Sequence, residues 1–221
     1  FPRWARFTPQ YLRMGGYRTY HAGKWHVPGK KPVADAGFDR SYFLQDQHRF
    51  FSTNEHYRND ERLPKPSPGY YATVAIAEHA IEWLREHRRQ HAASPYFLYL
   101  CFTAPHFPLQ APPEDIARQR GRYDQGWDAV RAQRYARQRK MGLVNTALPP
   151  RDSTFVPYWN LKPEEAKARI GPGELSRTIA WEELTPVEKE FQAKKMEVHA
   201  AMVARMDAEL GRVLAEARRS G

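Results

Sequence analysis

The chain has 221 residues, of which 41% are hydrophobic and 13% aromatic; this excludes a disordered protein and leaves room for one large domain or two small ones. Its mean hydropathy of −0.79, with no apolar run near the roughly 20 residues of a membrane-spanning helix, argues against a membrane protein. The single cysteine, Cys101, excludes an internal disulfide, and the net charge of +10 suggests an anionic partner without identifying it.

A short helix and a strand are predicted first. Thr8-Pro9 supplies an N-cap and a first helical residue, and the glycine pair Gly15-Gly16 ends that helix. A strand follows at Tyr17–Ala22 and ends in Gly23–His26. From there to Gly69 the chain is rich in Pro, Asp, Asn and Gly, which predicts mostly loop.

A helix and a second strand come next. Val74, Ala77, Ile81 and Leu84 recur at steps of three and four, which predicts one face of an amphipathic helix. Tyr96–Phe102 is an unbroken apolar and aromatic run, typical of a strand buried on both faces in the middle of a parallel sheet. A buried helix is the alternative, but the short length and flanking prolines favour a strand. This order of elements predicts an α/β layered fold.

The second half of the chain is predicted to be mainly helical. Pro112-Pro113-Glu114 begins one helix, and Asp128–Lys140 forms a basic one. Residues 145–173 hold many Pro and Gly and are predicted to be irregular. Thr185–Glu188 is a capping box, and the apolar residues behind it keep helical spacing to the end of the chain.

Three basic side chains follow the two predicted strands. Lys24 and His26 come after the first strand, and His106 follows the second through Thr103-Ala104-Pro105. Ligands of open α/β sheets bind outside the carboxyl ends of the strands, and residues two apart in an extended segment point the same way. Lysine suits an oxyanion, and histidine can donate a hydrogen bond or move a proton. Each residue taken singly is more often structural, so spacing alone predicts no more than a weak anion site.

Several segments, in order along the chain, resemble the sulfatase family. They are Leu12–Thr19 running into Gly23–His26, Asp35–Asp39, Pro95–Leu100, Thr103–Pro112 and Met196–Val203; a further segment, Tyr123–Asp128, is similar to the arylsulfatase branch in particular. The resemblance implies the α/β fold of the alkaline-phosphatase superfamily, here part of a mixed, mainly parallel sheet sandwiched by helices. It also implies that residues 1–221 are a partial N-terminal catalytic domain.

The resemblance implies roles for the three basic residues. Lys24 would hold a sulfate oxygen, and His106 would bind sulfate beside the leaving-group oxygen. His26 would contact the aldehyde-hydrate nucleophile and help to eject sulfate from it. His26 and His106 are therefore the predicted catalytic residues, and all three bind substrate. These roles suit preorganised donors facing developing negative charge. The reaction implied is hydrolysis of a sulfate monoester to an alcohol or phenol plus sulfate.

The resemblance also implies two cofactors whose residues this sequence does not contain. The family makes its formylglycine nucleophile from a C/S-x-P-x-R motif, which is absent here, and Cys101 is expected to be a small core residue. Calcium is implied, but the paired aspartates before the nucleophile and the Asp-Asn pair further on are missing, so no metal ligand is predicted. We therefore expect an internal fragment that is inactive alone.

Two other functions fit parts of the sequence. One is a phosphonate or phosphate monoester hydrolase of the same superfamily. The other is a basic nucleic-acid-binding module, in which Tyr123, Trp127 and Tyr135 would stack on bases between cationic side chains. Those cations are Arg118, Arg120, Arg122, Arg131, Arg134, Arg137, Arg139 and Lys140. A solvated helix face explains them better, so we expect no nucleic acid but a small-molecule or glycan sulfate ester. A periplasmic or secreted location would be usual for the family, although the sequence shows no signal peptide.

Overall fold

The computed structural model describes residues 4–27, 32–46, 48–152 and 161–219. They form two compact units. The first comprises the chain up to Ala111 together with the segment from Met202 onward, and the second runs from Pro112 to Ala201. No helix in the described ranges is both long enough and apolar enough to span a membrane.

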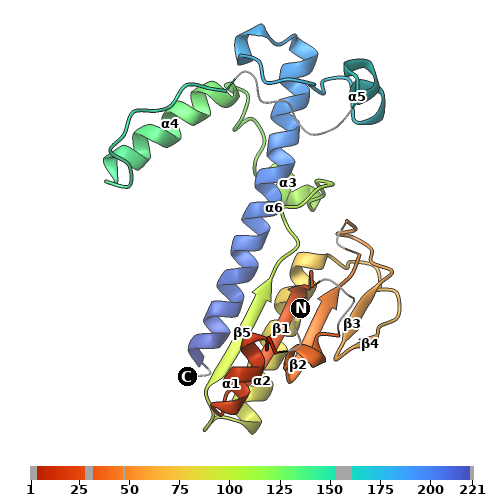
Figure 1. The fold of residues 1–221 in the computed structure, drawn as a ribbon. Helices are drawn as coiled ribbons and strands as arrows, with labels where there is room; N and C mark the ends of the chain where they lie inside the picture. The colour runs from red at the N-terminus through yellow and green to blue at the C-terminus, as the bar shows by residue number, and fades with distance from the viewer. Residues whose placement is uncertain (1–3, 28–31, 47, 153–160, 220–221) are drawn as a thin grey trace. The chain divides into compact units, whose positions relative to one another are not determined.

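A mixed five-stranded sheet forms the first unit (Figure 1). Its strands are β1 (Arg18–Lys24), β2 (Arg40–Leu44), β3 (His56–Arg58), β4 (Glu61–Arg62) and β5 (Tyr96–Cys101). They lie in the order β4-β3-β2-β1-β5. β1 pairs in parallel with both β2 and β5, whereas β3 pairs antiparallel with its two neighbours. The predicted fold class, a mixed sheet with helices, is therefore confirmed.

β1, rather than β5, is the buried strand with a neighbouring strand on each side. Its five inner residues, Thr19–Gly23, are all buried, whereas every β5 residue is at least partly exposed and Tyr99 is 44% exposed. Within the described sheet β5 lies at an edge. The prediction of a strand buried on both faces was wrong, because an apolar run records the character of the side chains and not the number of neighbouring strands.

β1 carries polar residues whose partners come from distant parts of the chain. The backbone N–H of Thr19 donates to the Asp39 carboxylate over 2.9 Å, and its hydroxyl donates to the Gly37 carbonyl over 2.7 Å. A buried polar side chain with such partners costs little free energy. This strand also runs to Lys24, two residues beyond its predicted end.

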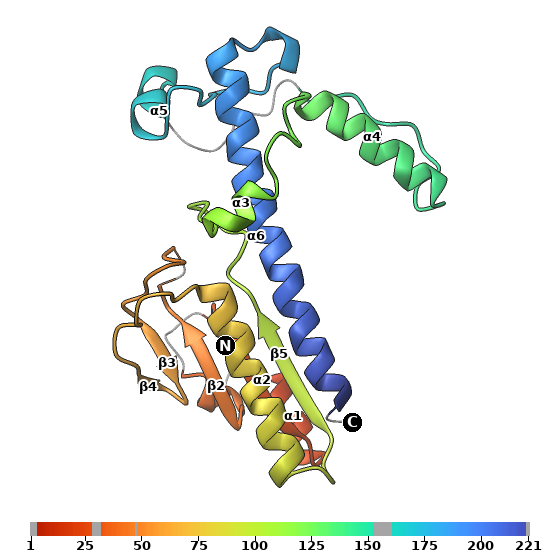
Figure 2. The ribbon, with the colours of Figure 1, turned by 180° about the vertical axis from the view of Figure 1, so that it is seen from behind.

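Helix α2 (Ala72–Gln90) covers one face of the sheet, as the apolar periodicity predicted (Figure 2). Its buried residues include Trp83, and the ring of His87 is hydrogen-bonded to the Tyr20 hydroxyl of β1 over 2.9 Å. Helix α1 (Thr8–Met14) contacts β1 as well. Thr8 is the first residue of α1 and not its N-cap, a shift of one residue from the prediction.

The segment predicted as loop up to Gly69 contains real structure. Besides β2, β3 and β4 it holds a short 3₁₀ helix, η1 (Ala34–Ala36). The prediction was wrong there because strands of two to five residues leave little periodicity to detect, and the abundance of turn residues outweighs it.

The second unit is helical. It contains α3 (Pro113–Ala117), α4 (Gly126–Lys140), α5 (Pro163–Arg169), the 3₁₀ helix η2 (Trp181–Glu183) and the first part of α6 (Pro186–Arg219). The capping box that begins α6 is confirmed, since the Thr185 and Glu188 side chains each accept the other residue's backbone N–H. α5 lies within the region predicted to be irregular, so that prediction was wrong over its seven residues.

The last part of α6 belongs to the first unit and is joined to α2 by ion pairs. The carboxylate of Glu216, whose side chain is 4% exposed, lies 3.2 Å from Arg85 and 3.1 Å from Arg88. Glu209 and Glu216 are buried on this part of α6 while Leu210 is 39% exposed. Charge pairing therefore contributes to the contact between these helices as well as apolar packing.

Candidate active site

The two segments that carry the predicted site residues meet at the same end of the sheet, where the carboxyl ends of the parallel strands lie. Lys24 is the last residue of β1, and His26 lies two residues beyond it. β5 ends at Cys101, which lies opposite Gly23 in the parallel register, and His106 follows in the next loop. The arrowheads of β1, β2 and β5 in Figure 1 point toward this end. Topology thus brings Lys24, His26 and His106 to the carboxyl ends of adjacent strands, although no hydrogen bond among the described residues joins the three directly.

Gly23 permits the close approach of these strands. Its φ of +119° is a backbone conformation that L side chains rarely adopt. A Cβ atom built at this position would lie 1.8 Å from the carbonyl oxygen of Cys101. Glycine at this position therefore allows β1 to remain paired with β5 up to the residue that precedes Lys24.

A buried histidine, His21, lies beneath the site and was not predicted from the sequence. Its side chain is inaccessible to solvent, and its Nε2 lies 3.3 Å from the carbonyl oxygen of Lys24. The ring packs 5.4 Å from Phe38, 5.5 Å from Trp25 and 5.7 Å from Tyr99, centroid to centroid. Because a carbonyl only accepts, Nε2 carries the proton in this hydrogen bond. The bond supports the turn that presents Lys24.

Burial in this aromatic surrounding lowers the pKa of His21 to about 4, so its imidazole is neutral at pH 7. Below pH 6.5 the unfolded chain takes up a proton at this residue, whereas the native state does so only near pH 4. Protons are therefore bound on unfolding in this range, and stability is lost as the pH falls from 6.5 to 4. A shift of this size corresponds to about 3 kcal/mol.

We expect His21→Gln to reduce this acid sensitivity. Glutamine can still donate its side-chain amide to the Lys24 carbonyl but does not titrate. Urea unfolding at pH 7 and pH 4.5 measures the loss of stability, which should be smaller in the variant than in the parent protein. It will not vanish, because burial also lowers the pKa of His79 to about 4. Gln45→Asn exchanges two side chains that do not titrate at an exposed position, so it is the control in which this loss of stability should equal that of the parent. An equal loss in His21→Gln and the parent would contradict this account.

The imidazole of His106 is exposed at the start of the loop after β5. Its Nδ1 lies 2.6 Å from the carbonyl oxygen of Phe107, and its backbone N–H donates to the Thr103 carbonyl over 3.1 Å. Nδ1 is therefore the donor to a main-chain acceptor, and Nε2 is the nitrogen left for a ligand. The ring of His48 lies 5.4 Å away, a neighbour that sequence spacing did not indicate.

A family model described as Sulfatase matches residues 3–221, almost the whole chain. The chain belongs to the sulfatase family. It is 34% identical over 225 residues to an arylsulfatase of Klebsiella aerogenes, covering 95% of this chain and 43% of that protein. It is 32% identical to an uncharacterized sulfatase of Schizosaccharomyces pombe, covering 93% of this chain and 36% of that protein. This sulfatase chain thus spans less than half the length of these curated relatives.

The fold agrees with solved sulfatase structures. The structure titled BT4656 in complex with its substrate D-glucosamine-2-N,6-O-disulfate superposes with a TM-score of 0.54 and 18% identity, covering 100% of this chain and 48% of that one. The putative sulfatase yidJ from Bacteroides fragilis gives a TM-score of 0.53 at 15% identity, covering 96% and 40% of the respective chains. At these identities the likeness establishes the fold alone.

Cys101 of this sulfatase chain has no features of an activated nucleophile. Its thiol is half-buried at the end of β5, and burial raises its pKa, while a hydrogen bond with the Tyr99 hydroxyl acts in the opposite direction. A raised pKa keeps the sulfur protonated and unreactive at neutral pH. The prediction of a small core residue is right about its place in a strand, but the side chain is half-buried and not fully enclosed.

The described residues do not fit a calcium site. Among them, no three histidine, cysteine, aspartate or glutamate side chains lie close enough together to hold a metal ion. A hard divalent cation takes six or more oxygen ligands. None of the described residues is therefore assigned to calcium.

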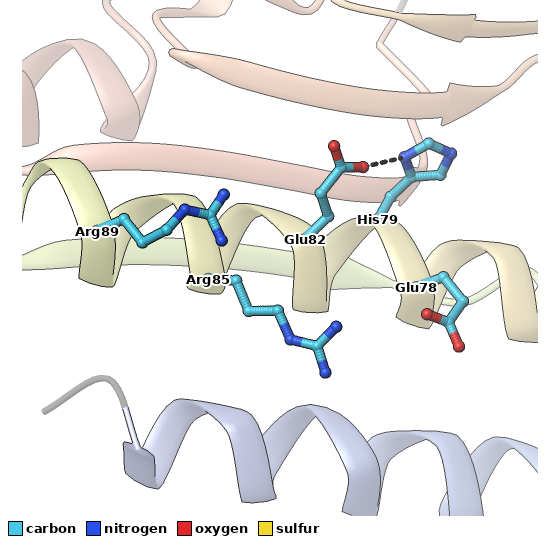
Figure 3. A pocket seen from close by; sticks show the side chains of 5 residues that line it. All are labelled: Glu78, His79, Glu82, Arg85 and Arg89. Atoms are coloured by element: carbon cyan, nitrogen blue, oxygen red, sulfur yellow. Dashed lines mark ion pairs between the residues drawn. The ribbon is translucent and has the colours of Figure 1, made fainter.

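A charged pocket on α2 is explained by structural ion pairs. It encloses about 420 Å³ and is lined by Glu78, His79, Glu82, Arg85 and Arg89 (Figure 3). His79 lies 3.6 Å from Glu82, while Glu78 and Arg85 extend toward α6, where they pair with Arg212 and Glu216 respectively. The pocket's charges thus connect α2 with its neighbours within the first unit.

In the second unit, two of the three aromatic residues of the basic region, Tyr123 and Trp127, pack against a hydrophobic cluster. The rings of Trp127 and Trp181 meet edge to face at 5.0 Å, and Tyr123 packs against the same cluster. The Tyr135 hydroxyl donates to the Thr146 carbonyl over 2.5 Å. The nucleic-acid hypothesis required these rings to be available for stacking, and this packing gives it no support.

Proposed function

We propose that the protein hydrolyses sulfate monoesters and that Lys24, His26 and His106 contact the transferred sulfate group. The observation that supports this proposal is the parallel pairing of β1 with β5, two strands whose carboxyl ends are followed by these three residues, in a member of the sulfatase family. The proposed substrate is a small-molecule or glycan sulfate ester. A periplasmic or secreted location is proposed with it.

The three side chains suit different parts of a sulfate ester. The Lys24 ammonium offers three donors and a full charge to non-bridging sulfate oxygens. His106 presents Nε2, because Nδ1 donates to the Phe107 carbonyl. As an imidazolium, with a proton on each ring nitrogen, it can transfer the Nε2 proton to the leaving oxygen as the sulfur–oxygen bond breaks, which leaves the neutral tautomer with its proton on Nδ1. His26, exposed beside Lys24, would assist the release of sulfate. Donors held before the reaction stabilise the charge that develops during it.

The proposal treats the chain as a partial N-terminal catalytic domain of a longer sulfatase. Formylglycine and calcium are the cofactors proposed for the whole enzyme, and no described residue is assigned to either. The 221 residues include neither a C/S-x-P-x-R motif nor a described cluster fit for a cation. We therefore propose that the 221-residue chain has no turnover by itself.

The test is a panel of matched esters assayed with the full-length protein. Nitrophenyl sulfate, nitrophenyl phosphate and a nitrophenyl phosphonate share one leaving group, so their kcat/KM values compare the transferred groups alone. We expect the sulfate to be the best of the three and the isolated 221-residue chain to leave all of them intact. A phosphate or phosphonate hydrolysed faster than the sulfate would replace this proposal with the superfamily alternative. Turnover of the sulfate by the isolated chain would contradict its inactivity.

A further inference from the structure

One main-chain carbonyl accepts hydrogen bonds from two histidines. The Phe107 carbonyl oxygen lies 2.6 Å from Nδ1 of His106 and 3.2 Å from Nδ1 of His48. A carbonyl has two lone pairs and no proton, so both ring nitrogens must be donors. The two imidazoles therefore share the same tautomer, with Nε2 of each left outside this contact. Their centroids are 5.4 Å apart and their planes are inclined by 55°.

The loop that carries His48 is fixed to the loop that carries His106. The side-chain amide of Gln110 donates to the His48 carbonyl over 3.0 Å and accepts the Phe50 N–H over 3.4 Å. Phe50 is 1% exposed, so its buried ring anchors the loop. The Gln110 carbonyl in turn accepts the Tyr71 hydroxyl over 2.9 Å. His48 therefore reaches Phe107 from a backbone that is held by the Gln110 side chain and by the buried Phe50.

His106 is less well fixed by its own contacts. Its ring donates to the carbonyl of the next residue, so ring and acceptor can rotate together. The bond from His48 holds that carbonyl from a second loop. A fixed acceptor stabilises the tautomer that has its proton on Nδ1, and in this tautomer Nε2 is the nitrogen that meets a ligand.

We propose that His48 is a positioning residue for His106, acting through the Phe107 carbonyl to keep Nε2 of His106 as the nitrogen that faces the sulfate ester. The expected effect of His48 on turnover rests on the proposed function. Its effect on the tautomer of His106 does not, because that effect concerns hydrogen bonds within the protein.

Two substitutions separate this role from simple packing. His48→Asn places an amide N–H close to the position of the imidazole Nδ1–H, whereas His48→Leu fills similar space without a donor. We expect His48→Leu to lower kcat for nitrophenyl sulfate about tenfold with little change in KM, and His48→Asn to recover most of that loss. His91→Leu is the control, and its kcat should be unchanged. His91 follows α2 and precedes β5, so it lies near the amino end of this strand, away from the candidate site.

A second measurement is independent of catalysis. In the full-length protein with ¹⁵N-labelled histidine, NMR reports which ring nitrogen of His106 carries the proton. We expect the Nδ1–H form in the parent and in His48→Asn, and a mixture of tautomers in His48→Leu. An unchanged His106 tautomer in His48→Leu, or equal kcat values for the two variants, would overturn the positioning role. If the tautomer shifts as expected while the parent hydrolyses no sulfate ester, the proposed function fails and the positioning role stands.

Discussion

Replacing Lys24 with methionine is expected to lower kcat/KM for nitrophenyl sulfate by about 100- to 1,000-fold in the full-length enzyme. Methionine keeps the unbranched shape of the half-buried side chain at the end of β1 but removes its charge and its three donors. Negative charge moves onto the leaving oxygen as the ester bond breaks, so a preorganised cation beside the sulfate group stabilises the transition state more than the substrate. Steady-state kinetics with the aryl sulfate measures the loss.

The control for charge is Lys65→Met, which removes an exposed lysine from the loop that precedes α2 and should leave kcat/KM unchanged. A Lys24→Met enzyme with parental kcat/KM would show that this lysine does not contact sulfate.

His106→Ala provides a second test of the candidate site. The loss of kcat/KM should be larger for a nitrophenyl sulfate than for a dinitrophenyl sulfate, because a better leaving group needs less protonation.

The shared location of the three candidate residues was predictable because its signal is local. Lys24, His26 and His106 each lie within a few residues of a strand end, and the parallel pairing of those strands follows from the α/β order of elements. The family resemblance then gave roles to the same three residues. Neither argument needed the partners of the residues to be known.

The parts that were missed depend on partners far away in the chain. Thr19 is polar, so β1 does not look like an inner strand until the Asp39 carboxylate and the Gly37 carbonyl, 20 and 18 residues away, are seen to accept from its backbone N–H and its hydroxyl. His48 reaches His106 because Gln110 joins two loops, and no spacing in the sequence encodes that contact. Long-range hydrogen bonds are properties of the folded chain, and a pattern read along the sequence does not contain them.

Gly23→Ala is expected to destabilise the first unit by at least about 4 kcal/mol. Two costs combine at this position. The residue has a φ of +119°, which a Cβ disfavours, and that Cβ would lie 1.8 Å from the Cys101 carbonyl oxygen and 2.6 Å from its carbon. The obstacle is backbone and not a flexible side chain, so β1 and β5 must separate to make room. Urea unfolding followed by circular dichroism measures the loss, and activity should fall with it because the strand ends hold Lys24 and His106.

Gly16→Ala measures the conformational cost of a positive φ without the steric overlap. Gly16 also has a positive φ, +84°, but a Cβ there meets nothing within 4 Å. Its substitution should cost only the conformational penalty, about 1 kcal/mol. The difference between the two variants then reports the overlap between β1 and β5 alone. Equal losses at the two glycines would mean that the strands can move apart at Gly23 without cost, and the close pairing of β1 with β5 would no longer explain how the strand ends present the site.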